Sequence, residues 1–431
     1  MLLPTLGSAG DVHPFIALAL ALQARGHRAT LLTNPLFQRL IERCGLGFQA
    51  VGSEERARAA INNPDIWHPR RGLPLVLQIM ADAVAEVFSI LERRADASTV
   101  VAASSLALGA RIAQDRLGLP TATVHLQPGV LRTLEGPLVL SPWQPRWQPR
   151  WSKAALFWLI DRGWIDPVLQ PPVNALRSKL GLRPVDRLMQ HWVHSPQCVL
   201  AMFPSWFAPP RGDWPPSTCL TGFPLWDARD MPVSVLPEST EATPSAGELE
   251  AFLANGEAPV VVTAGSAAAT LHQFFAESVR ALQALHRRAL LVTNFAQQLP
   301  SGLPSTILAT GYVPFSAVLP RAALIIHHGG IGTVAQAVAA GIPQLMVPRA
   351  FDQFDNAARI ERLGLGRTLA AGCYRAAAAA AVIREMLQDE PMRARCRSYA
   401  GRIDSAAALG TACGRLEALR SQPLGSARAV S

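Results

Sequence analysis

A glycine-rich turn between a short apolar run and a helical pattern occurs once in each half of this chain of 431 residues. The first turn lies within residues 7–15 and the second within residues 326–333. An apolar run that leads through glycines directly into a helix is typical of the strand–turn–helix unit of a parallel sheet. The two turns therefore predict an α/β chain with one parallel sheet in each half.

Short apolar runs alternate with helical patterns around both turns, which predicts parallel sheets covered by helices on both faces. The predicted strands are 2–6, 28–33, 99–103, 120–125, 259–263, 289–293, 324–327 and 344–347. The predicted helices are 14–25, 107–117, 271–285 and 334–340, with a helical tail beyond residue 391. Pro4 favours an edge position for the first strand, or a chain that begins upstream.

The chain is longer than a single hydrophobic core usually organises, so two domains are expected. We place the first domain at 1–215 and the second at 248–400. Residues 216–247 are rich in Pro, Ser, Thr and Asp and are predicted to be the interdomain linker. Residues 401–431 are predicted to be a helix and tail that return to the first domain.

The composition is that of a globular protein, with 49% hydrophobic and 16% charged residues. The net charge of +9 fits either a GC-rich genome or a surface that meets anionic lipid or a phosphorylated ligand. No zinc-finger or basic-aromatic pattern occurs, so no nucleic-acid partner is expected.

Six scattered cysteines without a CxxC pair indicate a reducing compartment. The sequence contains no uninterrupted run of about eighteen apolar residues, so no membrane-spanning helix is expected. We expect a cytoplasmic protein, with peripheral contact at the inner membrane left open.

The turn in the second half has the features of a diphosphate site. Gly329, Gly330 and Gly332 let a ligand approach the backbone closely, and Thr333 lies where a helix begins. Free N–H groups and the helix dipole, worth roughly 0.3–1 kcal/mol, favour an anion there. His327 ends the preceding strand and could donate a hydrogen bond to a phosphate oxygen. The alternative is a helix start that needs glycine for packing beside a buried histidine.

Two further loops follow strands of the second half. Gly265 and Ser266 could supply a second phosphate contact, although an ordinary turn explains them equally well. Asp352 and Gln353 offer paired polar atoms that suit vicinal sugar hydroxyls, with helix capping as the alternative. Enzymes that bridge phosphates through a divalent ion generally present acidic ligands for it. Because the helix start and His327 can take the role of the cation, no metal site is predicted.

The turn in the first half places a carboxylate at a helix start facing the cleft. Asp11 could act as the base that removes a proton from an attacking hydroxyl group. It could also serve only as a helix cap. His13 and His125 are alternative bases or acceptor contacts.

Read together, His327-x-Gly-x-x-Gly-Thr333 and Asp352-Gln353-x-x-Asn356 resemble the donor signature of the family-one glycosyltransferases. The resemblance implies the GT-B fold, with two Rossmann-like domains whose parallel sheets face each other across a cleft. It implies that His327 and Thr333 contact the donor diphosphate. It also implies that Asp352, Gln353 and Asn356 bind the donor sugar.

The same resemblance extends to two other short motifs. The segment Gly311-Tyr312-Val313-Pro314 matches the place where the family packs an aromatic side chain on the nucleobase, which implies that Tyr312 and Val313 contact the base. Most relatives carry Trp followed by Pro-Gln there, so the identity of the base is left open. The bacterial branch carries an aspartate in a GDV-x-P motif, which implies that Asp11 is the base.

Several longer segments resemble the rhamnosyltransferase A chains of rhamnolipid biosynthesis. The resemblance runs from residue 1 to near residue 400 and is carried by residues 7–15, 192–197, 203–210, 221–225 and 352–357. It implies transfer of L-rhamnose, with inversion, from the nucleotide sugar dTDP-L-rhamnose to the hydroxyl of a 3-(3-hydroxyalkanoyloxy)alkanoic acid. This hydroxy-fatty-acid acceptor would become a monorhamnolipid. His328 and His13 depart from the pattern, since those relatives carry Pro and Phe there.

Five tryptophans lie among Pro, Gln and Arg between residues 140 and 164, and they are Trp143, Trp147, Trp151, Trp158 and Trp164. Such a stretch suits the entrance for an amphiphilic acceptor or contact with a membrane surface. Whether the protein also requires a membrane-associated partner that supplies the acyl chains is left open. The alternative is that these aromatic residues pack an irregular loop against the first domain.

Three other functions remain open at this point. The chain could transfer another nucleotide sugar to a different lipid, sterol or polyketide. It could be a nucleotide-sugar epimerase or hydrolase on the same scaffold. It could also be a non-catalytic partner of another transferase, although such a protein would be expected to lack His327 or Asp11.

Overall fold

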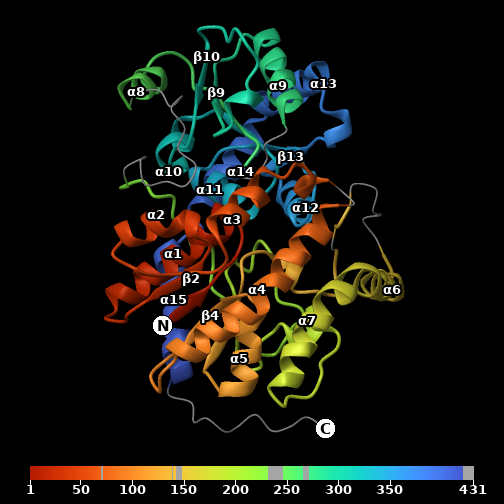
Figure 1. Cartoon of the computed structure of the whole chain (residues 1–431). Coiled ribbons are helices and arrows are strands. Elements are labelled where there is room, and N and C mark those ends of the chain that lie inside the picture. The colour runs from red at the N-terminus through yellow and green to blue at the C-terminus, as the bar shows by residue number, and fades with distance from the viewer. Residues whose placement is uncertain (69–70, 138, 142–147, 232–245, 266–270, 421–431) are drawn as a thin grey trace.

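The computed structural model describes residues 1–68, 71–137, 139–141, 148–231, 246–265 and 271–420. Two parallel sheets form the centres of two α/β domains that face each other (Figure 1). The strand order is β3-β2-β1-β4-β5-β6-β7 in the first sheet and β10-β9-β8-β11-β12-β13 in the second. The predicted architecture of two domains with parallel sheets is confirmed.

The first domain is built from short buried strands and longer helices. Its strands are β1 (Leu2–Pro4), β2 (Thr30–Thr33), β3 (Gly47–Ala50), β4 (Val101–Ser104), β5 (Thr121–His125), β6 (Cys198–Ala201) and β7 (Thr218–Leu220). Its helices are α1 (Ala9–Ala24), α2 (Gln38–Arg43), α3 (Glu54–Asn62), α4 (Gly72–Arg94), α5 (Gly109–Leu117), α6 (Arg150–Ile160) and α7 (Asp166–Lys179).

The second domain repeats this organisation. Its strands are β8 (Val260–Thr263), β9 (Ala289–Val292), β10 (Ile307–Thr310), β11 (Leu324–His327), β12 (Gln344–Met346) and β13 (Gly366–Thr368). The helices that follow β7 are α8 (Ala246–Ala254), α9 (His272–Ala284), α10 (Phe315–Val318), α11 (Ile331–Ala340), α12 (Gln353–Leu363), α13 (Ala376–Gln388), α14 (Glu390–Ala400) and α15 (Ser405–Arg420).

The strand β1 is central in its sheet, so the expected edge position is wrong. It pairs with β2 on one side and with β4 on the other. Pro4 is tolerated because it is the last residue of the strand, and the next N–H, that of Thr5, donates to the carbonyl of Leu32 (2.9 Å). The order of strands reverses between β1 and β4, which is where open α/β sheets bind ligands.

The helix α1 begins five residues before the predicted start at Pro14. Ser8 is its N-cap residue, and Asp11 completes a capping box with it. Pro14 lies inside the helix as its sixth residue, so the carbonyl of Gly10 loses the N–H that would otherwise donate to it. Because α1 begins at Ala9, the polar turn directly follows the carboxyl end of β1.

The helix α4 is long and apolar enough to cross a membrane, contrary to the expectation that no such helix occurs. It contacts α5 and α7. Ten of its residues are buried, and most of them belong to the first domain's hydrophobic core. Packing in that core accounts for its apolar composition.

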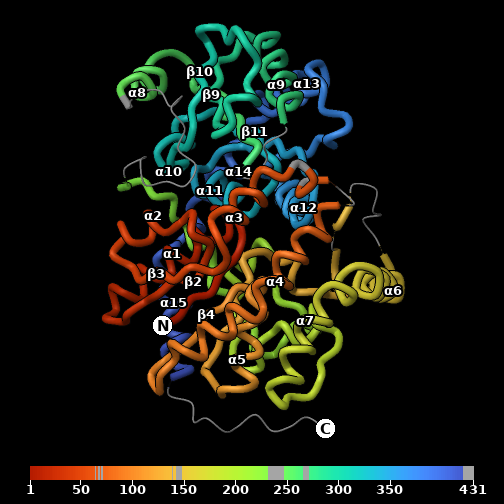
Figure 2. The backbone as a smooth tube through the Cα atoms, viewed as in Figure 1, coloured from red at the N-terminus to blue at the C-terminus, as the bar shows by residue number. Residues whose placement is uncertain are grey.

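The last described helix, α15, packs against α1 of the first domain (Figure 2). Glu417 accepts hydrogen bonds from Arg25 (2.6 Å) and pairs with His27 (2.9 Å). Apolar residues such as Leu416 join the core of the first sheet. The first sheet also includes β7, which lies beyond the boundary placed at residue 215.

Candidate active site

A cavity of ≈ 830 Å³ lies between the two domains and is lined by residues of both. The helices α1 and α11, which begin at the two glycine-rich turns, contact each other. The cavity brings together most of the predicted site residues, namely Asp11, His13, Gly265, Tyr312, Val313, Gly330, Gly332, Thr333, Asp352 and Gln353. His125, His327, Gly329 and Asn356 lie outside its lining, and Ser266 lies outside the described residues.

Asp11 faces the cavity from the first turn of α1. Its Oδ2 accepts hydrogen bonds from the backbone N–H of Ser8 (2.9 Å) and from the Ser8 hydroxyl (3.3 Å). Gly7 is required beside it, because a Cβ there would lie 2.2 Å from Oδ2 and the backbone has a φ of +123°. Burial raises the pKa of Asp11 to about 6, although the Ser8 hydrogen bonds oppose the shift. The same carboxyl group therefore caps the helix and is available as a base near neutral pH.

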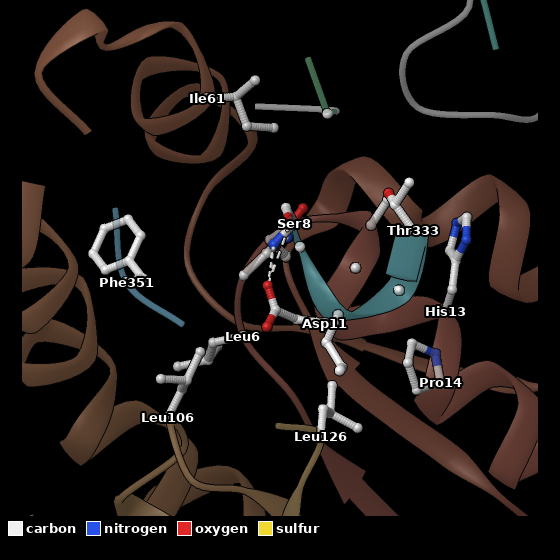
Figure 3. A pocket seen from close by; sticks show the side chains of 18 of the residues that line it. Leu6, Ser8, Asp11, His13, Pro14, Ile61, Leu106, Leu126, Thr333 and Phe351 are labelled. Carbon is white, nitrogen blue, oxygen red and sulfur yellow. Dashed lines mark hydrogen bonds between the residues drawn. The ribbon is translucent and has the colours of Figure 1, made fainter. Parts of the chain in front are cut away.

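Apolar side chains surround this carboxyl group. Figure 3 shows Leu6, Leu106 and Leu126 on one side of Asp11 and Thr333 of the second domain on another. This lining explains the raised pKa, since it excludes water from the charged form.

His13 also lines the cavity, two residues after Asp11 in α1. Its ring makes edge contacts with Trp226 (centroids 5.1 Å apart) and Tyr312 (6.3 Å). Burial lowers the pKa of His13 to about 4, so the imidazole is neutral at neutral pH.

His125 is buried at the end of β5, away from the cavity lining. Its Nε2 lies 2.9 Å from Nδ1 of His194. Burial and the neighbouring His194 lower the pKa of His125. Of the two alternative bases, the structure therefore brings only His13 to the cavity.

His327 points into the second domain rather than into the cavity. Its Nε2 lies 3.1 Å from Oε1 of Gln344, and its Nδ1 accepts a hydrogen bond from the N–H of Gly329 (3.1 Å). The side chain is fully buried, and burial lowers the pKa of His327 to about 3. Both ring nitrogens are engaged, so the predicted contact with a diphosphate would require the ring to turn.

His328 lines the cavity in its place. A Cβ at Gly265 would lie 2.6 Å from its ring, and one at Gly330 would lie 2.5 Å from it. Both glycines therefore make room for this imidazole. Burial and the charge of Arg349 lower the pKa of His328 to about 4. The two adjacent histidines are the signal for this site in the sequence, and the family resemblance implies a phosphate contact only for the first of them.

The start of α11 faces the cavity through Gly332 and Thr333. A Cβ at Gly332 would meet nothing within 4 Å, so packing inside the protein does not explain this glycine. The first N–H groups of a helix have no partner within it, and they attract anions. The arrangement fits a diphosphate at this position.

The loop after β12 supplies polar atoms on the same side. Oδ2 of Asp352 accepts a hydrogen bond from Nδ2 of Asn356 (2.6 Å), which also donates to the carbonyl of Gly329 (3.0 Å). Oε1 of Gln353 accepts from the N–H groups of Arg349 (2.8 Å) and Ala350 (3.2 Å). Asn356 thus positions Asp352 and the glycine turn. Gln353 lines the cavity.

Asp352 is the second perturbed carboxyl group of the cavity. Burial raises its pKa to about 7, and the charge of Asp11 contributes. Phe351, which sequence reasoning missed, lines the cavity beside it with a φ of +55°. Bulky residues adopt such a conformation rarely, and strained residues concentrate at functional sites.

Tyr312 is held in place by a residue that the motifs did not indicate. Its hydroxyl donates to the backbone carbonyl of Asp227. The Asp227 carboxylate in turn accepts from the N–H of Ser316 (2.7 Å) at the start of α10. Tyr312 and Val313 both line the cavity, as a nucleobase contact requires.

The cavity continues into an apolar lobe between α3 and α4, which no motif predicted. Apolar side chains of these helices line it, namely Ile61, Val76, Ile79 and Met80. Arg56 lines the same lobe from α3, and Glu86 from α4. Glu86 accepts from the N–H of Gly52 (3.0 Å), whereas no ion pair of Arg56 occurs among the described residues.

The tryptophan-rich stretch contributes nothing to this lining within the residues that the structure describes. Trp143 and Trp147 lie outside those residues. The expected acceptor entrance is therefore not formed by Trp151, Trp158 or Trp164. In the same described part of the chain, no cluster of three or more His, Cys, Asp or Glu side chains is arranged around a metal position.

Both halves of the chain match known protein families. Residues 1–130 match the glycosyltransferase family 28 N-terminal domain, and residues 280–410 match the erythromycin biosynthesis protein CIII-like C-terminal domain. The O-mycaminosyltylonolide 6-deoxyallosyltransferase of Streptomyces fradiae is 29% identical over 430 residues, covering 96% of each chain.

Solved structures of glycosyltransferases have the same fold. The kitacinnamycin glycosyltransferase has a TM-score of 0.72 at 18% identity, covering 97% of this chain and 98% of its own. The spinosyn rhamnosyltransferase SpnG in complex with thymidine diphosphate has a TM-score of 0.64 at 20% identity, covering 95% and 99%. With its paired parallel-sheet domains and these family matches, the chain is a glycosyltransferase of the GT-B fold.

Proposed function

We propose that the chain transfers L-rhamnose, with inversion, from dTDP-L-rhamnose to the hydroxyl of a 3-(3-hydroxyalkanoyloxy)alkanoic acid, giving a monorhamnolipid. One observation carries the proposal: a carboxyl group with a raised pKa, Asp11, shares a cavity with the open start of α11 and with Asp352. In such an arrangement Asp11 would act as the base for the acceptor hydroxyl, and the start of α11 with Asp352 would bind the donor.

The donor half of the proposal draws on the second domain. The N–H groups at the start of α11 and an N–H of the neutral His328 would stabilise the leaving diphosphate through hydrogen bonds. Tyr312 would stack on the base, and Asp352 with Gln353 would hold the sugar hydroxyls. Because helix start and imidazole supply the positive potential, we propose that no divalent metal is needed. The complex of SpnG, a rhamnosyltransferase, with thymidine diphosphate supports a dTDP-sugar.

The acceptor half draws on the lobe between α3 and α4. Its aliphatic lining suits an acyl chain, because burial of apolar surface favours such a ligand by about 25 cal/mol per Å². Arg56 would bind the terminal carboxylate of the hydroxy-fatty acid through a paired hydrogen bond. The acceptor hydroxyl would then lie between this lobe and Asp11.

A second candidate is transfer of a nucleotide sugar to an uncharged polyketide. The similarity to the 6-deoxyallosyltransferase of Streptomyces fradiae favours it, and the apolar lobe suits such an acceptor as well. The two candidates differ at Arg56, since an uncharged acceptor has no use for that cation.

Mass spectrometry of the products tests the proposal. The purified chain would be incubated with dTDP-L-rhamnose, dTDP-glucose or UDP-glucose, each with the hydroxy-fatty-acid dimer, with a macrolide aglycone or without acceptor. We expect a gain of one deoxyhexosyl unit on the dimer with dTDP-L-rhamnose, unchanged by EDTA. Product on the macrolide alone would establish the second candidate. Consumption of the donor without acceptor would indicate a hydrolase or epimerase, and loss of activity in EDTA would contradict metal independence.

A further inference from the structure

Large apolar side chains stand in solvent along α6 and the π-helical turn that follows it, Asp161–Ile165. The described residues include six exposed large hydrophobic side chains, and four of them belong to this segment. They are Trp151, Trp158, Leu159 and Trp164, with exposed fractions of 74%, 62%, 57% and 52%. We call these four residues the tryptophan face. Figure 2 shows α6 at the margin of the first domain.

The opposite side of the helix is firmly anchored, so the exposure is not the result of loose packing. Phe157 and Lys153 are buried, and the Lys153 ammonium donates to the carbonyl of Leu134 (3.0 Å). Arg132 stacks on the ring of Phe157 (5.1 Å) and pairs with Asp161 (2.6 Å). The anchored side thus fixes which side chains of α6 face outward.

The exposed charges of this segment have one sign. Arg150 and Arg162 are exposed, whereas Asp161, the only acid from 150 to 165, is buried and paired with Arg132. Two other acids lie beside the segment: Glu135, which lies 3.8 Å from Arg150, and the half-buried Asp166, which directly follows Ile165. The tryptophan face is therefore bordered by cations.

We propose that the tryptophan face docks the protein on an anionic lipid bilayer. Tryptophan favours the headgroup level of a bilayer, where its ring is apolar and its N–H remains hydrated. Arginine side chains at the border would pair with lipid phosphates, each contributing roughly 1 kcal/mol. Trp151 and Trp158 are seven residues apart and therefore share one side of α6. A short helix with aromatic residues on one side and cations beside them lies in the plane of such an interface.

The charge pattern argues against a second copy of the chain as the occupant. A symmetric dimer would place the same patch on both sides of the contact. The contact would then bring together the arginines of both copies without adding an exposed acid from this segment, and like charges repel. An anionic membrane surface satisfies the same two cations.

Co-sedimentation of the full chain with vesicles tests this docking. The vesicles would be phosphatidylcholine alone or with phosphatidylglycerol. We expect binding to the anionic vesicles, lowered at least about tenfold by the triple change Trp151→Ser, Trp158→Ser and Trp164→Ser. Reversal of charge by Arg150→Glu and Arg162→Glu should lower it roughly fivefold per residue or more.

Matched control variants distinguish the face from general surface effects. Leu117→Ser removes an exposed apolar side chain from α5, and Arg39→Glu with Arg43→Glu makes the same charge change on α2. Both controls should bind vesicles like the unaltered chain. Unaltered binding by the triple tryptophan variant would overturn the proposal. So would a dimer, seen by sedimentation velocity without lipid, that the triple variant abolishes while vesicles are not bound. Because only binding is measured, either outcome leaves the proposed sugar transfer untouched.

Discussion

Asp11 and Asp352 belong to different domains, yet both carboxyl groups line one cavity and the charge of Asp11 raises the pKa of Asp352. Burial is the larger cause of the shift for each, giving pKa values of about 6 for Asp11 and about 7 for Asp352. As the pH rises, Asp11 therefore loses its proton first. An ionised base beside a carboxyl group that can still donate a hydrogen bond to a sugar hydroxyl is a useful division of roles.

This coupling predicts that a change at Asp11 alters the titration of Asp352. In Asp11→Asn the neighbouring negative charge is gone, so the pKa of Asp352 should fall. The pH at which donor affinity changes should fall with it. Isothermal titration of dTDP-L-rhamnose from about pH 5 to about pH 8 measures this. His13→Phe serves as the control, because His13 is already neutral over that range. An identical pH dependence in Asp11→Asn and the unaltered chain would mean that the two carboxyl groups act independently.

The same substitution tests the role of Asp11 as the base. We expect Asp11→Asn to lower kcat at least ~100-fold, which is the usual size of a general-base contribution, with little change in donor affinity at about pH 8, where Asp352 is ionised in both proteins. In the unaltered chain, the rate should rise with pH through about 6 as Asp11 ionises. Full activity of Asp11→Asn would transfer the role to His13, which also lines the cavity.

The raised pKa of Asp11 has a consequence for folding stability as well. Because the folded state favours the protonated form, the contribution of Asp11 is present below its unfolded pKa near ~4 and is lost as the pH rises through about 6. Asp11→Asn should therefore raise Tm relative to the unaltered chain at neutral pH, and this gain should vanish in acid. Calorimetry at both pH values measures the difference. A Tm lowered equally at both values would show that the Ser8 hydrogen bonds outweigh the burial of charge.

The two adjacent histidines are expected to differ in function. His328→Ala should weaken binding of dTDP roughly tenfold or more, since a hydrogen bond to a charged phosphate is lost. His327→Ala should mainly lower the free energy of unfolding by about 1–3 kcal/mol, since it leaves Gln344 without its buried partner. Binding of dTDP and chemical denaturation of both variants separate the two effects. If His327→Ala bound dTDP weakly while His328→Ala bound it normally, His327 would be the phosphate contact.

The glycine turns and the strands that precede them could be predicted because they are encoded locally, by apolar runs and residues such as Gly329 that tolerate a positive φ. The choice between His327 and His328 could not be predicted from the sequence, because it depends on which ring fits between Gly265 and Gly330. The start of α1 was placed too late because Pro14 is a stronger local signal than the capping box of Ser8. The lobe between α3 and α4 has no motif, since it is created only when those helices pack over the sheet.

Arg56 provides the sharpest test of the acceptor. It lines the apolar lobe, and its proposed partner is the carboxylate of the hydroxy-fatty acid. Arg56→Ala should raise KM for that acceptor about tenfold or more, the size expected for a charge-assisted hydrogen bond, with KM for the donor unchanged. Arg58→Ala is the matched control, because Arg58 pairs with Glu54 on the exposed surface of the same helix (2.7 Å). The methyl ester of the acceptor lacks the negative charge, so it should be used equally well by Arg56→Ala and by the unaltered chain. If Arg56→Ala lowered the use of acid and ester alike, the side chain would shape the lobe rather than bind a carboxylate, and the uncharged polyketide would become the better acceptor.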